Sequence, residues 1–210
     1  MATQVLVADD HQIVRQGLKA LLEREGFKVV GEAANGQEAL QMAQQLHPEV
    51  AVLDLAMPVL NGLDTAREIH RLSPKTKTIF LTMHTEQHYI LEGLRSGAKG
   101  FVMKSHAAED LVRAIREAAR GGTYMSPEVS EAVVQAYQNK SKLPEDPLSA
   151  RERQVLQLIA EGKTTKEVAC ILEISVKTVE TYRTRILEKL NVHETASLVR
   201  YAIRRGLVQP

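Results

Sequence analysis

The first 121 residues alternate between continuous apolar runs and stretches in which apolar side chains recur every three or four residues. The runs predict strands at residues 4–8, 27–33, 50–54, 78–82 and 100–104. The stretches with helical spacing predict a helix after each strand, the first of them through Val14, Leu18 and Leu22. Five strands that alternate with five helices predict a five-stranded parallel sheet covered on both faces, a doubly wound α/β fold.

The chain changes character after residue 121. Ser126 and Pro127 predict the start of a short helix, and the polar segment 139–147, which contains two prolines, predicts a linker. Beyond it, capping boxes at 149–152 and 164–167 open two short helices, and further helices are predicted at 176–190 and 194–204. Two short helices joined by a tight turn are typical of helix-turn-helix domains. The predicted domains are therefore residues 1–121, a connection at 122–147, and an all-α domain at 148–210.

Charge and composition narrow the class of partner. Residues 148–210 carry 11 Lys and Arg against 7 Asp and Glu, whereas the rest of the chain has a net charge of −3. Only the basic second half is therefore expected to meet a polyanion. No apolar run approaches the ~18 residues of a membrane span, and no charged segment precedes the first strand, so we expect a cytoplasmic protein without membrane contact. The single cysteine, Cys170, lies in an apolar helical pattern and is expected in the core.

Asp54 ends the central apolar run, which Pro58 stops. In an open parallel sheet, ligands bind at the C-terminal edge of the strands. The run alone is also typical of a buried strand that simply ends on a polar residue. The other predicted strand ends favour chemistry at this edge, because they add further polar side chains: Asp9, Asp10, Thr82 and Lys104.

These side chains together fit phosphoryl chemistry. Three carboxylates at close range repel one another unless a hard cation binds, and Mg²⁺ prefers carboxylate, carbonyl and water oxygens. With Mg²⁺ bound, Asp54 could attack a phosphoryl group and become an aspartyl phosphate. Thr82 could donate a hydrogen bond to one phosphoryl oxygen, and Lys104 could pair with another.

On these residues, the segment 1–121 resembles the receiver domain of bacterial two-component response regulators, which implies a flavodoxin-like fold. The resemblance implies that Asp54 is the phosphoacceptor, and that Asp10, Asp54 and the carbonyl of Ala56 bind Mg²⁺ while Asp9 assists through water. It also implies that Thr82 is the switch hydroxyl, Lys104 the phosphate-binding lysine and Phe101 the aromatic switch residue.

Three histidines lie near these positions in the sequence: His11, His84 and His106. Their spacing does not match a metal site of the histidine type, so we expect them at the polar surface or rim. The resemblance to other receivers also places the side chains of Ala56 and His84 beside the path of a water that would attack the phosphorylated aspartate.

The predicted helix 176–190 has two unlike faces. At about 100° per residue, one arc is apolar and holds Val176, Val179, Ile186, Leu187 and Leu190. The opposite arc holds Lys177, Thr181, Thr184, Arg185 and Glu188, with Thr178 and Glu180 on its flanks. For an arbitrary helix, such a polar face by itself favours a solvated helix surface.

The segment 148–190 resembles the LuxR-type helix-turn-helix domain. The matching residues are Leu148, Ser149, Arg151 and Glu152, then Gly162 closing the first helix, and Ser175, Thr178 and Val179 opening the recognition helix. This resemblance implies base contacts in the major groove from Glu180, Thr181 and Thr184, and phosphate contacts from Lys177, Thr178, Arg185 and Lys189. Glu180 and Tyr182 stand where many members carry Lys and His, a departure that bears on DNA sequence preference rather than on DNA binding.

Both halves together resemble response regulators of the NarL/FixJ class. The resemblance implies that a sensor histidine kinase phosphorylates Asp54, that the receiver changes state, and that the second domain binds double-stranded DNA as a homodimer. An aspartyl-phosphate enzyme with Asp9 or Asp10 as nucleophile is a second hypothesis, disfavoured because the sequence encodes no cap domain or substrate pocket. A third hypothesis is a DNA-binding protein whose receiver only mediates dimerisation, and the intact acidic cluster argues against it.

Overall fold

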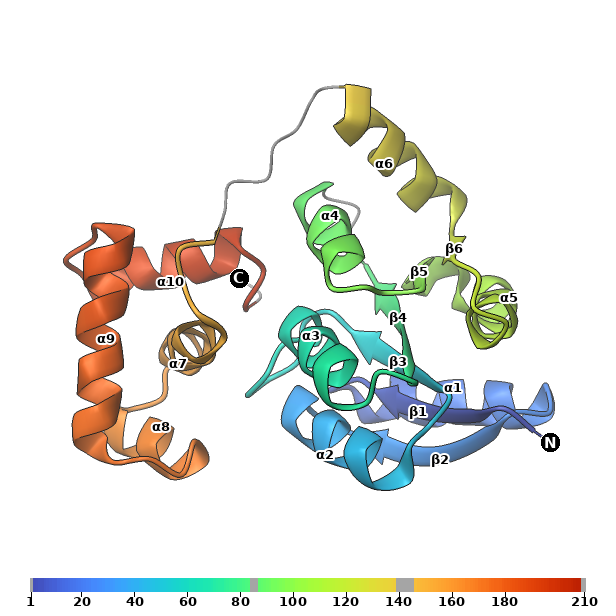
Figure 1. Cartoon of the computed structure of the whole chain (residues 1–210), viewed down its shortest axis with the longest axis horizontal. Helices are drawn as coiled ribbons and strands as arrows, with labels where there is room; N and C mark the ends of the chain where they lie inside the picture. The colour runs from blue at the N-terminus through green and yellow to red at the C-terminus, as the bar shows by residue number, and fades with distance from the viewer. Residues whose placement is uncertain (1, 84–86, 139–145, 209–210) are drawn as a thin grey trace. The chain divides into compact units, whose positions relative to one another are not determined.

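The computed structural model describes residues 2–83, 87–138 and 146–208, and the chain forms two compact units whose division falls within the predicted linker 139–147. Most of that linker, residues 139–145, lies outside the described residues, as does His84. The first unit holds all the strands of the described chain, and the second holds helices (Figure 1). The predicted order of an α/β domain followed by an all-α domain is thereby confirmed.

A single parallel sheet organises the first unit. Its strands are β1 (Gln4–Ala8), β2 (Lys28–Ala33), β3 (Val50–Asp54), β4 (Lys77–Thr82), β5 (Gly100–Met103) and β6 (Tyr124–Met125), in the order β2-β1-β3-β4-β5-β6. The predicted count of five strands is wrong by one. β6 has only two residues, which is too short to leave a hydrophobic period in the sequence.

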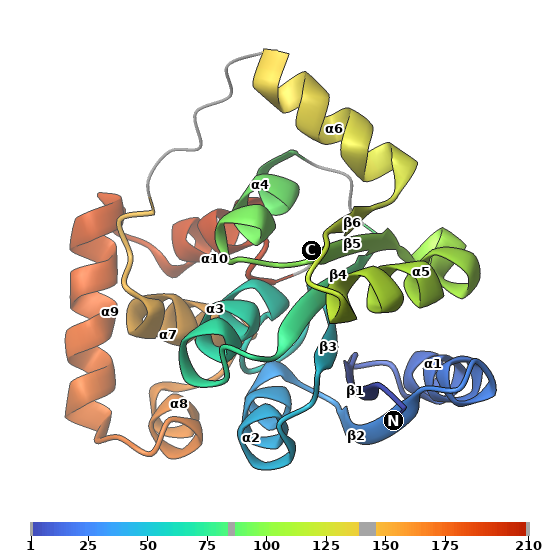
Figure 2. The same ribbon diagram turned by 45° about the vertical axis from the view of Figure 1, so that its right-hand side comes forward.

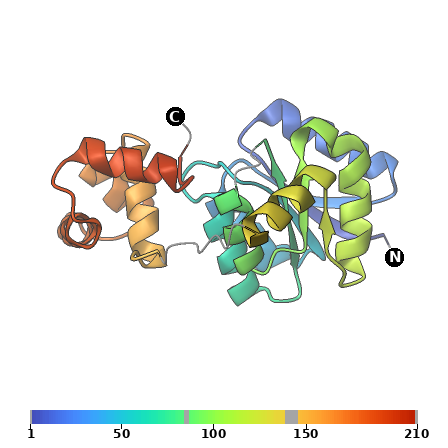
Figure 3. The same cartoon turned by 90° about the horizontal axis from the view of Figure 1, so that it is seen from above.

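Alternating strand side chains divide the core of this unit into two layers. Side chains such as Leu6, Leu53 and Phe80 face α2 (Gly36–Leu46), α3 (Gly62–Leu72) and α4 (Gln87–Arg95). Their neighbours Val7, Val52 and Leu81 face α1 (Gln12–Arg24) and α5 (Ala107–Ala119), which follows a short 3-10 turn at Lys104–His106. Figures 2 and 3 show these helices on opposite sides of the sheet. Both faces are therefore buried, as a parallel sheet requires.

The predicted connection at 122–147 contributes to the first unit. β6 pairs with β5, and α6 (Pro127–Gln138) places Val129 and Ala132 in the same core layer as residues of α3 and α4. The first unit thus extends beyond residue 121 and includes β6 and α6.

The second unit consists of α7 (Ala150–Ala160), α8 (Thr165–Ile171), α9 (Val176–Leu190) and α10 (Thr195–Arg204). Both predicted capping boxes are present, with Ser149 and Glu152 at α7 and Thr164 and Glu167 at α8. The prediction for Cys170 is wrong, because this side chain is exposed. α8 turns Val168, Ala169 and Leu172 into the core, and a residue at position 170 lies on the opposite side of the helix.

Over the part of the chain that the structure describes, no helix combines the length and the apolar composition that crossing a bilayer demands.

Candidate functional site

The acidic cluster forms where β1 and β3 end side by side. Asp54 is the last residue of β3 and is only 5% exposed, and Asp9, which directly follows β1, is 1% exposed. β3 lies between β1 and β4 and is buried throughout, so a fully buried strand carries its terminal carboxylate to the C-terminal edge of the sheet. The sequence argument placed both residues correctly at this edge.

The start of α3 holds the end of β3 in place. Gly62 N donates a hydrogen bond to the carbonyl oxygen of Leu55 at 2.8 Å, and Asn61 caps the helix by accepting from Asp64 N at 2.9 Å. Gly62 lies so close to β3 that a Cβ added there would be 2.9 Å from Leu55 Cα and 3.0 Å from the carbonyl carbon of Asp54. This close backbone approach fixes the position of Asp54.

Lys104 reaches the cluster from the end of β5. Its Nζ atom lies 2.8 Å from Asp54 Oδ2 and 2.7 Å from Asp9 Oδ2. Burial raises the pKa of Asp54, and the nearby Asp9 and Asp10 add to this effect, whereas Lys104 opposes it. Burial acts to lower the pKa of Lys104, but Asp54 and Asp9 outweigh burial and raise it. The lysine is therefore held charged beside both carboxylates.

The donor set fits a magnesium ion. Ligand atoms from Asp9, Asp10, His11 and Asp54 all lie within 4.8 Å of one another. Among the described residues, no donor makes a well-directed hydrogen bond to the buried Oδ2 atom of Asp9, although Lys104 Nζ is near it. Lys104 offsets one of the three negative charges, so a hard divalent cation would complete the charge balance.

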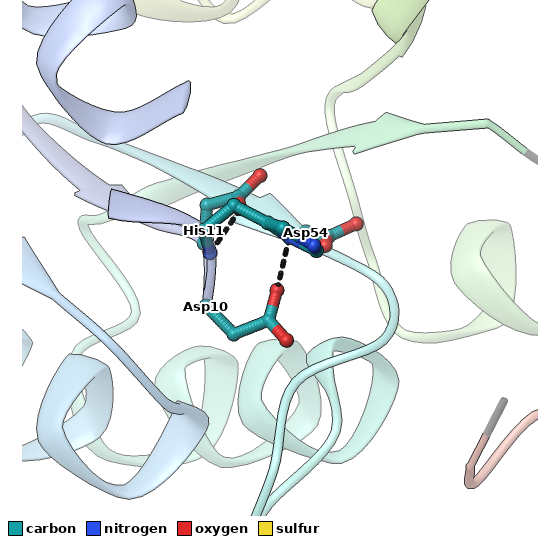
Figure 4. A group of neighbouring side chains, drawn as sticks. Asp10, His11 and Asp54 are labelled. Atoms are coloured by element: carbon teal, nitrogen blue, oxygen red, sulfur yellow. Dashed lines mark hydrogen bonds and ion pairs between the residues drawn. The ribbon is translucent and has the colours of Figure 1, made fainter. Parts of the chain in front are cut away.

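His11 contacts this cluster, which sequence reasoning did not predict. Its Nδ1 atom lies 2.7 Å from Asp10 Oδ1, and Figure 4 shows both side chains next to Asp54. The side chain of His11 is 66% exposed, so it lies at the rim as expected. The only signal in the sequence was its position directly after Asp10. His106 also lies at the surface, with Nδ1 3.7 Å from a carboxylate oxygen of Glu128.

The two predicted switch residues are both buried. Thr82 ends β4 and is 1% exposed, and Phe101 in β5 is completely buried with its ring 5.2 Å from that of Phe80. Gly93 in α4 leaves the space for this ring, because a Cβ there would lie 2.5 Å from Phe101 Cζ. Ala56 lies two residues beyond Asp54 and is partly exposed, whereas the prediction for His84 falls outside the described residues.

The predicted polar face of α9 is exposed. Lys177, Glu180, Thr181, Thr184 and Arg185 are all accessible, and Thr178 is partly buried. The hydroxyls of Thr181 and Thr184 donate to the carbonyls of Lys177 and Glu180 at 2.9 and 3.1 Å. Because their donor hydrogens are used within the helix, these hydroxyls offer acceptor lone pairs to a partner. Ser175 caps the helix by accepting from Thr178 N at 3.1 Å.

Lys189 differs from the other predicted DNA contacts. Its Nζ atom lies 2.7 Å from Oε2 of Glu152, a carboxylate buried in the first turn of α7. Burial acts to raise the pKa of Glu152, but hydrogen bonds from Lys189 and Ser149 outweigh burial and lower it. Lys189 is thus engaged inside the second unit.

The chain thus combines an α/β domain that carries a carboxylate and lysine site at the edge of its sheet with a domain of the helix-turn-helix type. Comparison with known families agrees. The model of the response regulator receiver domain matches residues 5–116, and that of the bacterial regulatory proteins of the luxR family matches residues 146–202. The chain belongs to the two-component response regulators of the NarL/FixJ class and is a transcription regulator rather than an enzyme.

Relatives match along the whole chain. The oxygen regulatory protein NreC of Staphylococcus carnosus (strain TM300) is 38% identical over 214 residues, covering 98% of this chain and 99% of its own. The response regulator UvrY of Shigella flexneri is 37% identical, covering 97% and 94%. Among solved structures, RcsB of Salmonella typhimurium matches with a TM-score of 0.61 at 30% identity, covering 95% and 97%. A structure of the RcsB–DNA complex matches with a TM-score of 0.61 at 29% identity, covering 96% and 98%.

Proposed function

We propose that this regulator is switched by formation of an aspartyl phosphate on Asp54, and that the phosphorylated form binds DNA as a homodimer. The observation that supports this most is the buried cluster in which Lys104 Nζ lies within 2.8 Å of both Asp54 and Asp9. If Lys104 served only to stabilise the fold through an ion pair, a single carboxylate beside it would be enough. A lysine shared between two buried carboxylates, with Asp10 beside them, is arranged for an additional ion and a phosphoryl group.

In the proposed reaction, a carboxylate oxygen of Asp54 attacks the phosphorus of a phosphohistidine on a sensor kinase. The phosphorus–nitrogen bond breaks, and the histidine leaves with the electron pair of that bond. Mg²⁺, held by Asp10, Asp54 and the carbonyl of Ala56 with Asp9 acting through water, would supply positive charge to the phosphoryl oxygens. Lys104 exchanges its contact with Asp54 for one phosphoryl oxygen, and the hydroxyl of Thr82 donates to another.

The switch follows from the position of Thr82. Thr82 lies two residues beyond Phe80 on β4 and so on the same face of the strand, and the ring of Phe80 lies 5.2 Å from that of Phe101. We propose that movement of the Thr82 hydroxyl toward the phosphoryl group is passed to Phe101 along this face. An aspartyl phosphate adds charge and acceptor oxygens, and such a local change can bias a two-state element. We propose that this bias favours dimerisation and DNA binding by the second domain.

The DNA contacts come from the exposed face of α9. Glu180, Thr181 and Thr184 would face base edges in the major groove, and Lys177, Thr178 and Arg185 would meet phosphates. The relative RcsB supports this assignment, because its solved structures include a complex with DNA and dimers bound to two parallel DNAs. A protein that meets a kinase and DNA in this way would act in the bacterial cytoplasm.

The proposal is tested by labelling with acetyl phosphate and Mg²⁺. We expect one phosphoryl group per wild-type chain, mapped to Asp54 by mass spectrometry and removed by hydroxylamine, which cleaves acyl phosphates. Asp54→Asn should take no label, EDTA should suppress labelling, and the exposed control Glu109→Gln should label like the wild type. A hydroxylamine-resistant label, or full labelling of Asp54→Asn, would contradict the proposal.

A further inference from the structure

The first turn of α7 contacts both helices of the helix-turn-helix. Oε2 of Glu152 accepts from Ser149 N and from Lys189 Nζ, each at 2.7 Å, and the second of these bonds joins α7 to the last turn of α9. The neighbouring Arg151 donates from NH2 to the carbonyl oxygen of Leu172 at 2.8 Å, at the C-terminal end of α8. Two adjacent side chains of α7 therefore fix the ends of the two helices whose relative orientation the motif depends on.

Lys189 lies at the edge of the face that is proposed to meet DNA. At 3.6 residues per turn, its direction is about 110° around the helix from the centre of the arc formed by Lys177, Thr181 and Thr184, and about 20° beyond Thr178. The Glu152 side chain that holds it is only 4% exposed, whereas the Lys189 side chain is 42% exposed. The ammonium group of Lys189 is thus paired with a buried carboxylate, although much of the lysine side chain remains accessible.

We propose that Lys189 is a positioning residue for DNA recognition: by binding Glu152 it fixes the tilt of α9 on α7, and it does not contact a DNA phosphate. This inference rests on the proposed DNA-binding function of α9. It replaces the expectation, carried by the family resemblance, that Lys189 meets the DNA backbone.

The length of α9 makes such an anchor effective. Lys189 and Lys177 are separated by about 18 Å along the helix axis at 1.5 Å per residue. A tilt of about 5° at the anchored end would move the other end by about 1.5 Å, more than the ~0.5 Å width of the hydrogen-bond distance range. Base contacts near the start of α9 would therefore be lost before the helix itself unfolds.

Glu152→Gln tests the two roles of Lys189 against each other, because the variant removes the negative charge that holds the lysine and keeps the cap. Glutamine also serves in a capping box, so Ser149 N retains its acceptor. If Lys189 acted on phosphates, removing its competing carboxylate would leave DNA binding unchanged or strengthen it. As a positioning residue, Lys189 instead loses its anchor, and the preference for the selected site over random duplex should fall by about 3- to 10-fold.

Salt dependence provides the second readout. Binding is measured for the phosphorylated full chain on a duplex selected by the wild type and on a random duplex, from low to moderate salt. Lys177→Met, the phosphate-contact control, should reduce the salt slope by about one. Lys189→Met should change the slope by less than a third of that and lose site preference as Glu152→Gln does. A slope change equal to that of Lys177→Met, or tighter binding by Glu152→Gln, would overturn the proposal.

Folding and function are separated by two controls. Circular dichroism and thermal unfolding establish that each variant is folded, and the double variant Glu152→Gln/Lys189→Met avoids a lone buried carboxylate if Lys189→Met is unstable. Under the proposal the double variant has the site preference of Glu152→Gln alone, whereas a further loss would overturn it. Failure of the wild type to bind DNA would instead contradict the proposed function.

Discussion

Replacing Gly62 by alanine tests whether the close approach of α3 to β3 positions the phosphoacceptor. The added Cβ would lie 2.9 Å from Leu55 Cα and 3.0 Å from the carbonyl carbon of Asp54, and nearer still to the carbonyl oxygen of Asp54. Carbon atoms in ordinary contact are about 3.5–4.0 Å apart. The backbone of β3 and the first turn of α3 would therefore have to separate by about 1 Å or more, because the nearest atom, the carbonyl oxygen of Asp54, sets the required movement.

Relieving this contact costs stability because the three atoms nearest to the added Cβ all belong to the backbone. A flexible side chain could rotate away, but the end of β3 is buried and hydrogen-bonded in the middle of the sheet. Overpacking a rigid core costs typically 1–3 kcal/mol, and we expect the upper part of this range, about 3 kcal/mol. A shift of about 1 Å in a reacting group can lower a rate about 100-fold, so phosphorylation of Asp54 should slow by about one to two orders of magnitude.

Two assays check the expectation. Urea unfolding of the first unit, followed by circular dichroism, gives the loss of stability, and labelling with acetyl phosphate gives the rate. Gly17→Ala is the matched control, because Gly17 lies in α1 with nothing within 4 Å of an added Cβ. Alanine there should stabilise the helix by about 0.5–1 kcal/mol and leave labelling unchanged. Wild-type stability and labelling in Gly62→Ala would refute the reasoning.

Three further predictions follow from the same geometry. Gly93→Ala places a Cβ 2.5 Å from Phe101 Cζ, so it should cost about 1–3 kcal/mol and weaken the DNA-binding response to phosphorylation; an undiminished response would argue against the aromatic switch. Glu180→Ala should relax base preference at one position, worth about 1–3 kcal/mol, and leave or raise affinity for random DNA; an identical site in a binding-site selection would contradict this. Because the folded-state pKa of Glu152 is lowered, its charge stabilises the second unit above the ordinary value of 4.5, and this stability disappears as pH falls through the lowered pKa. Unfolding of Glu152→Gln and wild type should therefore differ at pH 7 and converge in acid; an equal difference at both would contradict it.

The sequence was sufficient to predict which side chains meet at the C-terminal edge of the sheet. Parallel strands bring their C-terminal ends to one edge, so Asp9, Asp54 and Lys104 had to be neighbours once their strands were recognised. In the structure, Lys104 Nζ lies within 2.8 Å of a carboxylate oxygen of each aspartate. The periodicity of α9 likewise predicted its exposed face. These predictions succeeded because they depend on where each backbone element begins and ends.

Other features depend on packing that local patterns do not contain. The ion pair between Glu152 and Lys189 joins residues 37 positions apart, and it forms only because α7 and α9 cross near these side chains. The two-residue strand β6 leaves no period of its own. Cys170 was misplaced because the seven-residue helix α8 is too short for its apolar face to be distinguished from its exposed one.

The central claim is that the state of Asp54 controls the affinity of the second domain for DNA. The direct test is a titration of the full chain onto its selected duplex, with and without acetyl phosphate and Mg²⁺, alongside Asp54→Asn. The account predicts that phosphodonor strengthens wild-type binding by about 5- to 150-fold, as expected of a coupling free energy of about 1–3 kcal/mol, and has no effect on Asp54→Asn. Equal wild-type affinity under both conditions, with Asp54 labelled, would contradict the account and favour a receiver that serves only as a dimerisation scaffold.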